Sequence, residues 1–482
     1  MNNARGAIKS RFTAGSPLSW ALLLAVAVVA GVLVARDAGW LVAGAVVAAG
    51  VFATRIEHKI AIAFLLVFFP FSPGSVGPIP NVLLSEVLVP LAFPPVLMAV
   101  VRAGRPLLPQ EGRRYAFAAG VLVAVTFVHF VNGPVLASFS GTGSLGSSGL
   151  RPFYDLFVYV LLFFMSVWVF EWVPATSESW ARILFVLLAG CVALSVLRLV
   201  GVGLGVDTPL MTGVFDYGGR TRLESGVPVL RIGGLAEVAT LGLACLAAVW
   251  TMRQIKPSTA IILLLWLLAC VGLSGGRSLA IGVAFAVLAY LVGPARGRRL
   301  RVMVGGALVL GVIVFVAVRY GYSTQIVRIL TLQGGIEQQD PARAQIFAIL
   351  WGYFLENPFI GKGIGVAGEG LSDAFVAAQV VAGGHSSYMS MLGNFGLAGA
   401  LFIATFVLDP VVRALAHTRR TIAEKIHGLP QGLMTLVLVH AVIKAFEYVA
   451  GGSGYRDPSM FIIAAVFVVA LSLERRSVDE EA

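Results

Sequence analysis

Charged side chains are scarce in this sequence of 482 residues: Asp, Glu, Lys and Arg make up 12% of it, whereas hydrophobic residues make up 58%. A soluble domain is usually about a quarter charged. The mean hydropathy is +0.90, and apolar runs of about twenty residues, each long enough to cross a bilayer as a helix, recur along the chain. The shortage of charge excludes an ordinary soluble enzyme and predicts an all-α polytopic membrane protein.

Cysteine is also rare, and Cys191, Cys245 and Cys270 all lie inside apolar runs. They have neither paired spacing nor histidine partners, so we expect small core residues rather than a disulfide framework or a zinc site. The outer loops lack a P-loop, an Asp-x-Asp pair and a metal-ligand cluster. Residues 363–368 fit G-x-G-x-x-G, but no βαβ unit surrounds them, so a dinucleotide site is rejected. We expect no metal and no cofactor.

The apolar runs predict about 12–14 transmembrane helices in a single integral membrane domain that spans residues 1–482. The first run follows a basic N-terminus but lacks a convincing cleavage site, so we interpret it as an uncleaved span. The candidate spans are residues 18–36, 38–54, 59–72, 82–101, 115–132, 153–172, 181–203, 233–251, 258–274, 278–293, 302–319, 386–408, 431–448 and 458–473.

The basic residues predict the orientation. The net charge of +11 could suit a nucleic acid, but most Lys and Arg residues lie in short loops between spans. Placing both termini in the cytoplasm puts most of them on the cytoplasmic side, as the positive-inside rule requires. Among the histidines, His58, His417 and His427 then fall in cytoplasmic loops. No nucleic-acid partner is expected.

Three long loops fall on the outer side, at residues 133–151, 204–232 and 320–385. The first is rich in Gly and Ser and is expected to be flexible. The third is the large periplasmic loop, and it carries two short amphipathic helices. One runs from Ala342 to Glu356, with Asp340 as its cap and Pro341 at its first position, and the other covers residues 372–381.

His385 begins the span that follows this loop. The positive end of a helix dipole favours a neutral imidazole, which is the form that a general base requires. A structural alternative is an interfacial histidine that hydrogen-bonds a loop carbonyl. Position alone leaves both interpretations open.

Several arginines on the outer side are not explained by the positive-inside rule: Arg222, Arg231, Arg277 and Arg343. A guanidinium presents a planar fork that suits phosphate oxygens. The structural alternative is an anchor that reaches the lipid headgroups, or, for Arg343, a pair with Asp340. Within the thirteenth span, His440, Lys444 and Glu447 are spaced to share one helix face. Lys444 and Glu447 are expected to form a neutralised pair or an acceptor site.

Six elements of the chain form one pattern: Arg231; Ser274-Gly-Gly-Arg277-Ser278; Arg343 with Trp351; Glu356-Asn-Pro-Phe-Ile-Gly-Lys-Gly-Ile-Gly365; His385-x-x-Tyr388; and Gly396-Leu-x-Gly399. This pattern resembles the O-antigen ligase and polymerase family of bacterial envelope enzymes. Two positions differ from the family, which usually has Asn at the place of Ser386 and often has Glu at the place of Asn394.

The resemblance implies a fold like that of the C-type glycosyltransferases and a metal-independent transfer at the periplasmic face of the bacterial inner membrane. The donor is a glycan on a polyprenyl (undecaprenyl) pyrophosphate. His385 acts as general base or positions the acceptor, and Arg231, Arg277 and Arg343, with Arg222 and Tyr388, contact the substrate. Expected partners are this donor, a glycan or lipid-linked acceptor, membrane lipids and other polysaccharide-assembly proteins.

Three functions remain open from the sequence. The favoured one is an O-antigen or exopolysaccharide polymerase that joins lipid-linked repeat units, because the chain has more expected spans than a typical ligase. The second is an O-antigen ligase that moves a finished glycan to lipid A-core or another acceptor. The third, from a different class, is a transporter or flippase for a lipid-linked glycan.

Overall fold

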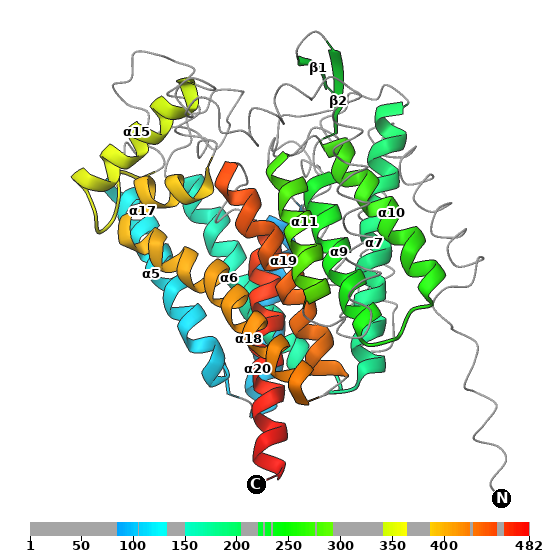
Figure 1. Ribbon diagram of the computed structural model, residues 1–482. Coiled ribbons are helices and arrows are strands. Elements are labelled where there is room, and N and C mark those ends of the chain that lie inside the picture. The colour runs from blue at the N-terminus through cyan, green and yellow to red at the C-terminus, as the bar shows by residue number, and fades with distance from the viewer. Residues whose placement is uncertain are drawn as a thin grey trace, which may run out of the picture.

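The structure, a computed structural model, describes residues 84–104, 106–132, 150–203, 220–224, 227–232, 235–274, 277–292, 341–363, 386–424, 428–450 and 457–481. These residues form a bundle of long helices with a small hairpin at one end (Figure 1). Seven helices in this part of the chain are long and apolar enough to cross a membrane. The prediction of an all-α polytopic membrane protein is confirmed.

Each expected span within the described ranges is a helix, and the expected spans 18–36, 38–54, 59–72 and 302–319 lie outside those ranges. The elements are α4 (Leu84–Arg102), α5 (Arg113–Asn132), α6 (Leu150–Glu171), α7 (Ser177–Gly203), β1 (Arg220–Glu224), β2 (Val227–Arg231), α9 (Leu235–Thr251), α10 (Pro257–Ser274), α11 (Arg277–Val292), α15 (Pro341–Glu356), α17 (Ser387–Ile403), α18 (Asp409–Glu424), α19 (Leu429–Ala450) and α20 (Pro458–Glu481). A 3₁₀ turn, Gln110–Gly112, precedes α5, and a π-helical turn, Ala404–Leu408, joins α17 to α18.

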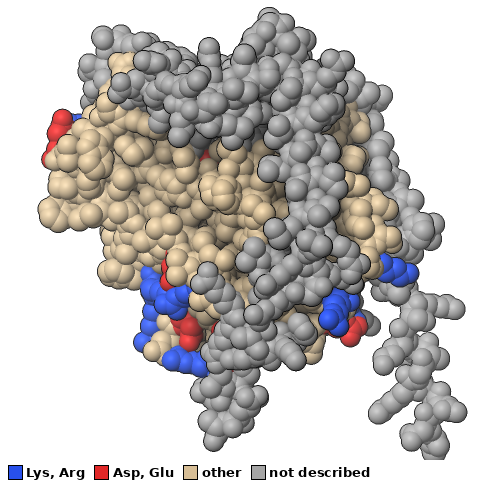
Figure 2. Space-filling view, in the orientation of Figure 1, with Lys and Arg blue, Asp and Glu red and all other residues tan. Residues whose placement is uncertain are grey.

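The bundle has two distinct ends (Figure 1). The upper end, as drawn there, carries the β1–β2 hairpin, α15 and the start of α11, and the lower end carries the C-terminal end of α20. Lys and Arg gather at the lower end in Figure 2. Helix α4 has Arg102 in its last turn, and helix α5 begins at Arg113.

The apolar core runs the length of the bundle and is rich in aromatic rings. Tyr115 of α5 meets Phe406 of the π-helical turn edge-on, with ring centroids 5.2 Å apart, and Phe163 of α6 lies 6.0 Å from both rings. All three buried cysteines are unpaired, as expected for core residues.

One loop prediction is corrected. The segment around Arg413 and His417, expected as a cytoplasmic loop, is helix α18, so the span predicted to end near residue 408 continues through Ser387–Thr418. Helix α18 has a buried face and an exposed face: Ala414 is fully buried, whereas Val412 and Arg413 are exposed. Averaging the hydropathy over both faces gives a low value, so the segment resembles a loop in the sequence.

Candidate active site

Helix α19 is the centre of the upper end, because α9, α11, α17 and α20 all pack on it. Its contact with α11 is close: a Cβ added to Gly282 would lie 2.7 Å from the carbonyl oxygen of Ile443. Next to this contact, the rings of Phe285 and Phe446 stack with their centroids 4.4 Å apart. Segments far apart in the sequence therefore meet around the upper half of one helix.

The backbones that carry Arg231 and Arg277 are tied together at this end. Arg231 ends β2, and the amide of the next residue, Ile232, donates to the carbonyl of Leu273, 3.1 Å away, in the last turns of α10. Arg277 is the first residue of α11. The structure thus brings together two of the positions that the sequence proposed for phosphate contact.

The β1–β2 hairpin, which contains Arg231, carries further arginines. Its antiparallel register pairs Arg220 with Arg231 and Arg222 with Val229. Arg343 lies in the first turn of α15, also at the upper end (Figure 1). Helix α15 begins at Pro341 and ends at Glu356, as predicted, while the proposed cap Asp340 and the second loop helix, residues 372–381, lie outside the described ranges.

His385 also lies outside the described ranges, but the residue after it is well defined. Ser386 is extended, with φ −144° and ψ 117°, and is the N-cap of α17, its hydroxyl accepting a 3.5 Å hydrogen bond from the Met389 amide. His385 therefore directly precedes a helix N-terminus, as predicted. Ser and Asn are both favoured N-cap residues, which accounts for Ser386 where the family usually has Asn.

Two hydroxyls dock the start of α17 onto α19. Ser386 donates to the carbonyl of Tyr448 at 3.3 Å, and Tyr388 donates to the carbonyl of Ala445 at 2.8 Å. The Tyr388 ring also meets the Tyr448 ring edge-on, with centroids 6.3 Å apart. The Tyr388 hydroxyl thus has a protein partner in this structure.

The motif that begins at Glu356 and the motif that contains Gly396 form one interlocked unit, named here the backbone clasp (residues 356–363 with 393–397). The amides of Lys362 and Gly363 donate to the carbonyls of Gly393 and Asn394, each at 3.0 Å. In return, the Leu397 amide donates to the carbonyl of Pro358 at 2.7 Å. Two segments that are distant in the sequence are thereby locked together by main-chain hydrogen bonds.

Glycine is required in the backbone clasp by geometry. Gly396 has φ +59°, which kinks α17 between an upper segment, residues 387–395, and a segment that continues through the π-helical turn into α18. A Cβ there would clash with the carbonyl oxygen of Pro358, and a Cβ on Gly361, whose φ is +69°, would clash with the backbone of Asn394. Gly396 thus allows the kink in α17, and Gly361 allows the close approach of the two backbones of the clasp.

A buried charged network lies at the upper end of α19. The Lys444 ammonium is 2.8 Å from a carboxylate oxygen of Glu447 and 2.8 Å from one of Asp457. The Tyr448 hydroxyl donates to Asp457 at 2.9 Å. Burial raises the pKa of the Asp457 carboxyl, but the charges of Lys444 and His440 and the hydrogen bonds from Lys444 and Ser459 together lower it by more, so the pKa lies below its ordinary value.

Sequence reasoning missed most of this network. Asp457 was overlooked although Asp457-Pro458 is a helix-start signal: its carboxylate accepts from the Ser459 amide at 3.0 Å, and Pro458 is the first residue of α20. His440, expected on the same face as Lys444, forms a hydrogen bond of 2.9 Å with the Ser459 hydroxyl. Glu237 of α9 interacts electrostatically with both Lys444 and Glu447.

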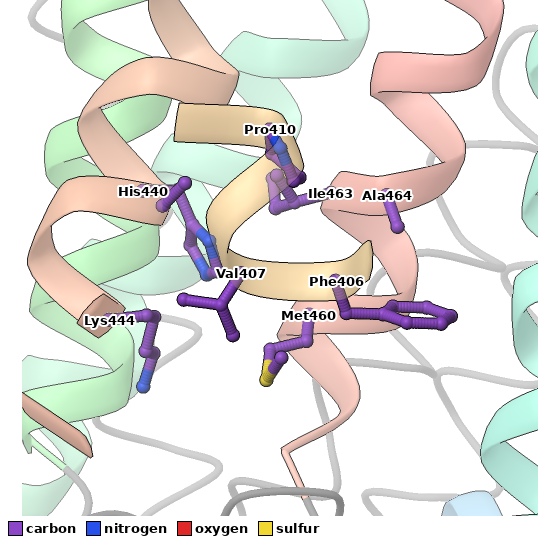
Figure 3. A pocket seen from close by; sticks show the side chains of 9 residues that line it. Phe406, Val407, Pro410, His440, Lys444, Met460, Ile463 and Ala464 are labelled. Atoms are coloured by element: carbon purple, nitrogen blue, oxygen red, sulfur yellow. The ribbon is translucent and has the colours of Figure 1, made fainter. Parts of the chain in front are cut away.

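Beneath the network is a small cavity of about 10 Å³ between the π-helical turn, α19 and α20 (Figure 3). His440 and Lys444 line it from α19, and Phe406 and Met460 from the turn and α20. It has room for roughly one water molecule and so is not a substrate pocket. No group of three or more His, Cys, Asp or Glu side chains suited to a metal occurs among the residues that the structure describes.

Comparison with known proteins identifies one family. Residues 261–404 match the family model described as O-antigen ligase. No curated protein matches the chain. The matched segment covers most of α10 and all of α11, α15 and α17, and so includes Arg277, Arg343, His385 and the backbone clasp. Over residues 261–404 the resemblance drawn from the motifs is confirmed: this segment of the integral membrane protein matches the O-antigen ligase family.

Proposed function

We propose that this protein is a bacterial cell-envelope glycosyltransferase that polymerises O-antigen or exopolysaccharide repeat units carried on polyprenyl pyrophosphate. The observation that carries the proposal is the convergence of the matched family segment and the outer arginines on one end of the bundle. There, Ile232 beside Arg231 is bonded to Leu273, which directly precedes the Ser274–Arg277 element, and Ser386 beside His385 is bonded to α19.

Two chemical tasks follow for this reaction. Polyprenyl pyrophosphate is already a good leaving group, so the enzyme must balance its growing negative charge and orient the acceptor. Arg231 and Arg277, with Arg222 and Arg343 as further contacts, supply fixed positive charge at the end where the pyrophosphate would lie. Because arginines can perform this task, we propose a metal-independent reaction.

His385 performs the second task in this proposal. The acceptor hydroxyl oxygen attacks the anomeric carbon, the bond from that carbon to the pyrophosphate oxygen breaks, and the pyrophosphate leaves with the electron pair. The hydroxyl proton passes to the imidazole of His385, which the N-terminus of α17 favours in its neutral form. Support comes from the position of Ser386 as the helix cap.

The orientation is part of the proposal. The arginine-rich lower end faces the cytoplasm and the upper end faces the periplasm of the inner membrane, which puts the C-terminal end of α20 inside. A cysteine introduced at exposed Phe359 should react with a membrane-impermeant maleimide in intact spheroplasts, and one introduced at Arg475 should react only after lysis. The reverse labelling pattern would overturn this topology.

One genetic experiment separates the two envelope functions. In a strain that lacks the gene, single-repeat glycan without a ladder indicates a polymerase, whereas a ladder that stays on the polyprenyl carrier indicates a ligase. Unchanged envelope glycans would exclude both. Complementation with His385→Ala should fail, while His417→Gln, which changes a histidine at the lower end, should restore the glycan.

The transporter alternative is tested in the same strain. If His385→Ala blocks glycan assembly while the lipid-linked precursor still reaches the outer leaflet, the protein acts as an enzyme. A precursor that accumulates only on the cytoplasmic leaflet would favour transport instead.

A further inference from the structure

The upper segment of α17, residues 387–395, is held at both of its ends. At its far end the backbone clasp fixes it through the amide of Leu397, which donates to Pro358, and through the carbonyls of Gly393 and Asn394. At its near end, Ser386 and Tyr388 hold it against α19. A segment of this length with both ends fixed by hydrogen bonds has little freedom to slide or rotate.

The near-end contacts use a carbonyl that the helix itself leaves open. Helix α19 ends at Ala450, so the carbonyl of Tyr448 belongs to the last four, which have no partner within the helix. The Ser386 hydroxyl donates to this oxygen while the same oxygen atom of Ser386 caps α17. One buried side chain, 3% exposed, therefore joins the end of α19 to the beginning of α17.

The end of α19 is in turn fixed to α20. Lys444 bridges to Asp457, and Tyr448 donates to the same carboxylate, whose other oxygen accepts hydrogen bonds from the amide and hydroxyl of Ser459. All of these groups are buried. The carbonyls that receive Ser386 and Tyr388 are thus attached to a rigid support and not to a fraying helix end.

We propose that Ser386 and Tyr388 are positioning residues for the transfer reaction: their hydrogen bonds to the end of α19, which the Lys444–Asp457 bridge holds in place, fix the start of α17, which His385 directly precedes in the chain. The inference rests on the proposed role of His385 as general base. It assigns to Tyr388 a function through α19 in place of the direct substrate contact that the family resemblance suggested. Because transfer rates fall steeply when a catalytic group is misplaced by even about 1 Å, losing either bond should slow the reaction itself.

Two conservative variants remove the hydrogen bonds to α19. Ser386→Ala loses the bond to Tyr448 together with the cap bond from the Met389 amide, and Tyr388→Phe loses the bond to Ala445 while keeping the ring against Tyr448. For each we expect kcat to fall about tenfold or more, with the KM for the donor unchanged, because donor contacts are not altered. Ser386→Thr, which keeps a hydroxyl and a capping oxygen, should restore kcat to within about threefold of the wild type.

The assay uses the full-length protein in proteoliposomes and the lipid-linked glycan extracted from the strain that lacks the gene. Each rate is divided by the amount of monodisperse protein recovered from gel filtration, so that a loss of folded protein is not counted as a loss of kcat. Thr435→Ala is the matched control, since it removes a buried hydroxyl from α19 that bonds only within its own helix, to Gln431. Its kcat should equal that of the wild type.

The outcomes distinguish this inference from the proposed function. If His385→Ala is inactive but Ser386→Ala and Tyr388→Phe keep the wild-type kcat, the positioning role is wrong and the base is retained. If Tyr388→Phe raises the donor KM and leaves kcat unchanged, Tyr388 contacts the substrate directly, and the positioning role is again overturned. If His385→Ala itself is fully active, the proposed function of His385 fails.

Discussion

The two ends of the bundle each hold a charged cluster, and the clusters differ in burial. At the upper end, the side chains of Lys444, Glu447 and Asp457 are 3%, 10% and 2% exposed. At the lower end, Asp409 lies 2.8 Å from both Arg114 and Arg413, but these side chains are 22%, 31% and 52% exposed. One cluster has been removed from solvent and the other has not.

This difference in burial implies that the upper cluster has a larger desolvation penalty than the lower one. Partly exposed ion pairs are screened by solvent and contribute little to stability. Buried charges carry a large desolvation penalty, which their mutual attraction and hydrogen bonds must offset. Apolar side chains could fill the space around Lys444 at lower cost, so a buried network beside the family motifs is best explained by a requirement of the site, namely a fixed end of α19.

The largest expected effect comes from breaking the buried cluster. Lys444→Met leaves Glu447 and Asp457 as uncompensated buried carboxylates, which should cost about 3–5 kcal/mol. Thermal unfolding in detergent should therefore show a clearly lower Tm. Lys362→Met is the matched control, because Lys362 pairs with Glu356 at 3.4 Å on the exposed surface. Equal Tm values for the two variants would show that burial does not determine the cost of losing an ion pair.

The next effect concerns the backbone clasp beside the upper cluster. Gly396→Ala forces a Cβ into the carbonyl of Pro358 at a positive φ, and such strain costs about 1–3 kcal/mol. Gly352→Ala, in a helical part of α15 where a Cβ would meet nothing within 4 Å, should instead be stabilising by up to about 1 kcal/mol. The sign of the change in Tm decides the outcome: a Gly396→Ala protein as stable as wild type would mean that the kink is not fixed.

A smaller effect is expected from the lower cluster at its most buried member. The Tyr115 hydroxyl donates to Asp409 at 2.8 Å, and Tyr115→Phe removes that bond while the ring stays packed against Phe406. Because Arg114 continues to balance Asp409, the loss should be about 1 kcal/mol. A loss as large as that of Lys444→Met would show that the lower cluster is equally important to the fold.

The smallest effect is expected at the exposed rim of the lower cluster. Arg413→Gln removes a pair with Asp409 that lies along one helix face, and pairs of this kind contribute about 0.3–0.5 kcal/mol. Any difference in Tm should disappear at high salt, because exposed pairs are screened. A difference that persists in 1 M salt would contradict the interpretation of this cluster as solvent-exposed.

Sequence patterns predicted what depends on composition along one helix. The spans within the described ranges, including the helix start near Ser386, follow from hydropathy, and the bounds of α15 follow from Pro341 and Asn357-Pro358. These predictions agree with the structure, apart from the end of the span expected at residues 386–408. The spacing of Lys444 and Glu447 likewise placed both on one face.

What could not be predicted depends on contacts between distant segments. The backbone clasp joins Pro358 to Leu397 through main-chain atoms, which leave no trace in side-chain pattern apart from glycine. Asp457 became part of the network only when the start of α20 met the end of α19. Amphipathic α18 was mistaken for a loop because window averages mix its buried and exposed faces.

The most direct test of the account is the rate of polyprenyl pyrophosphate release from purified protein in proteoliposomes supplied with the extracted lipid-linked glycan. Wild-type protein should release it together with elongated glycan, and His385→Ala should lower the rate by at least about a hundredfold, as expected for loss of a general base. Release by His385→Ala at the wild-type rate would contradict the central claim that the start of α17 is the catalytic centre.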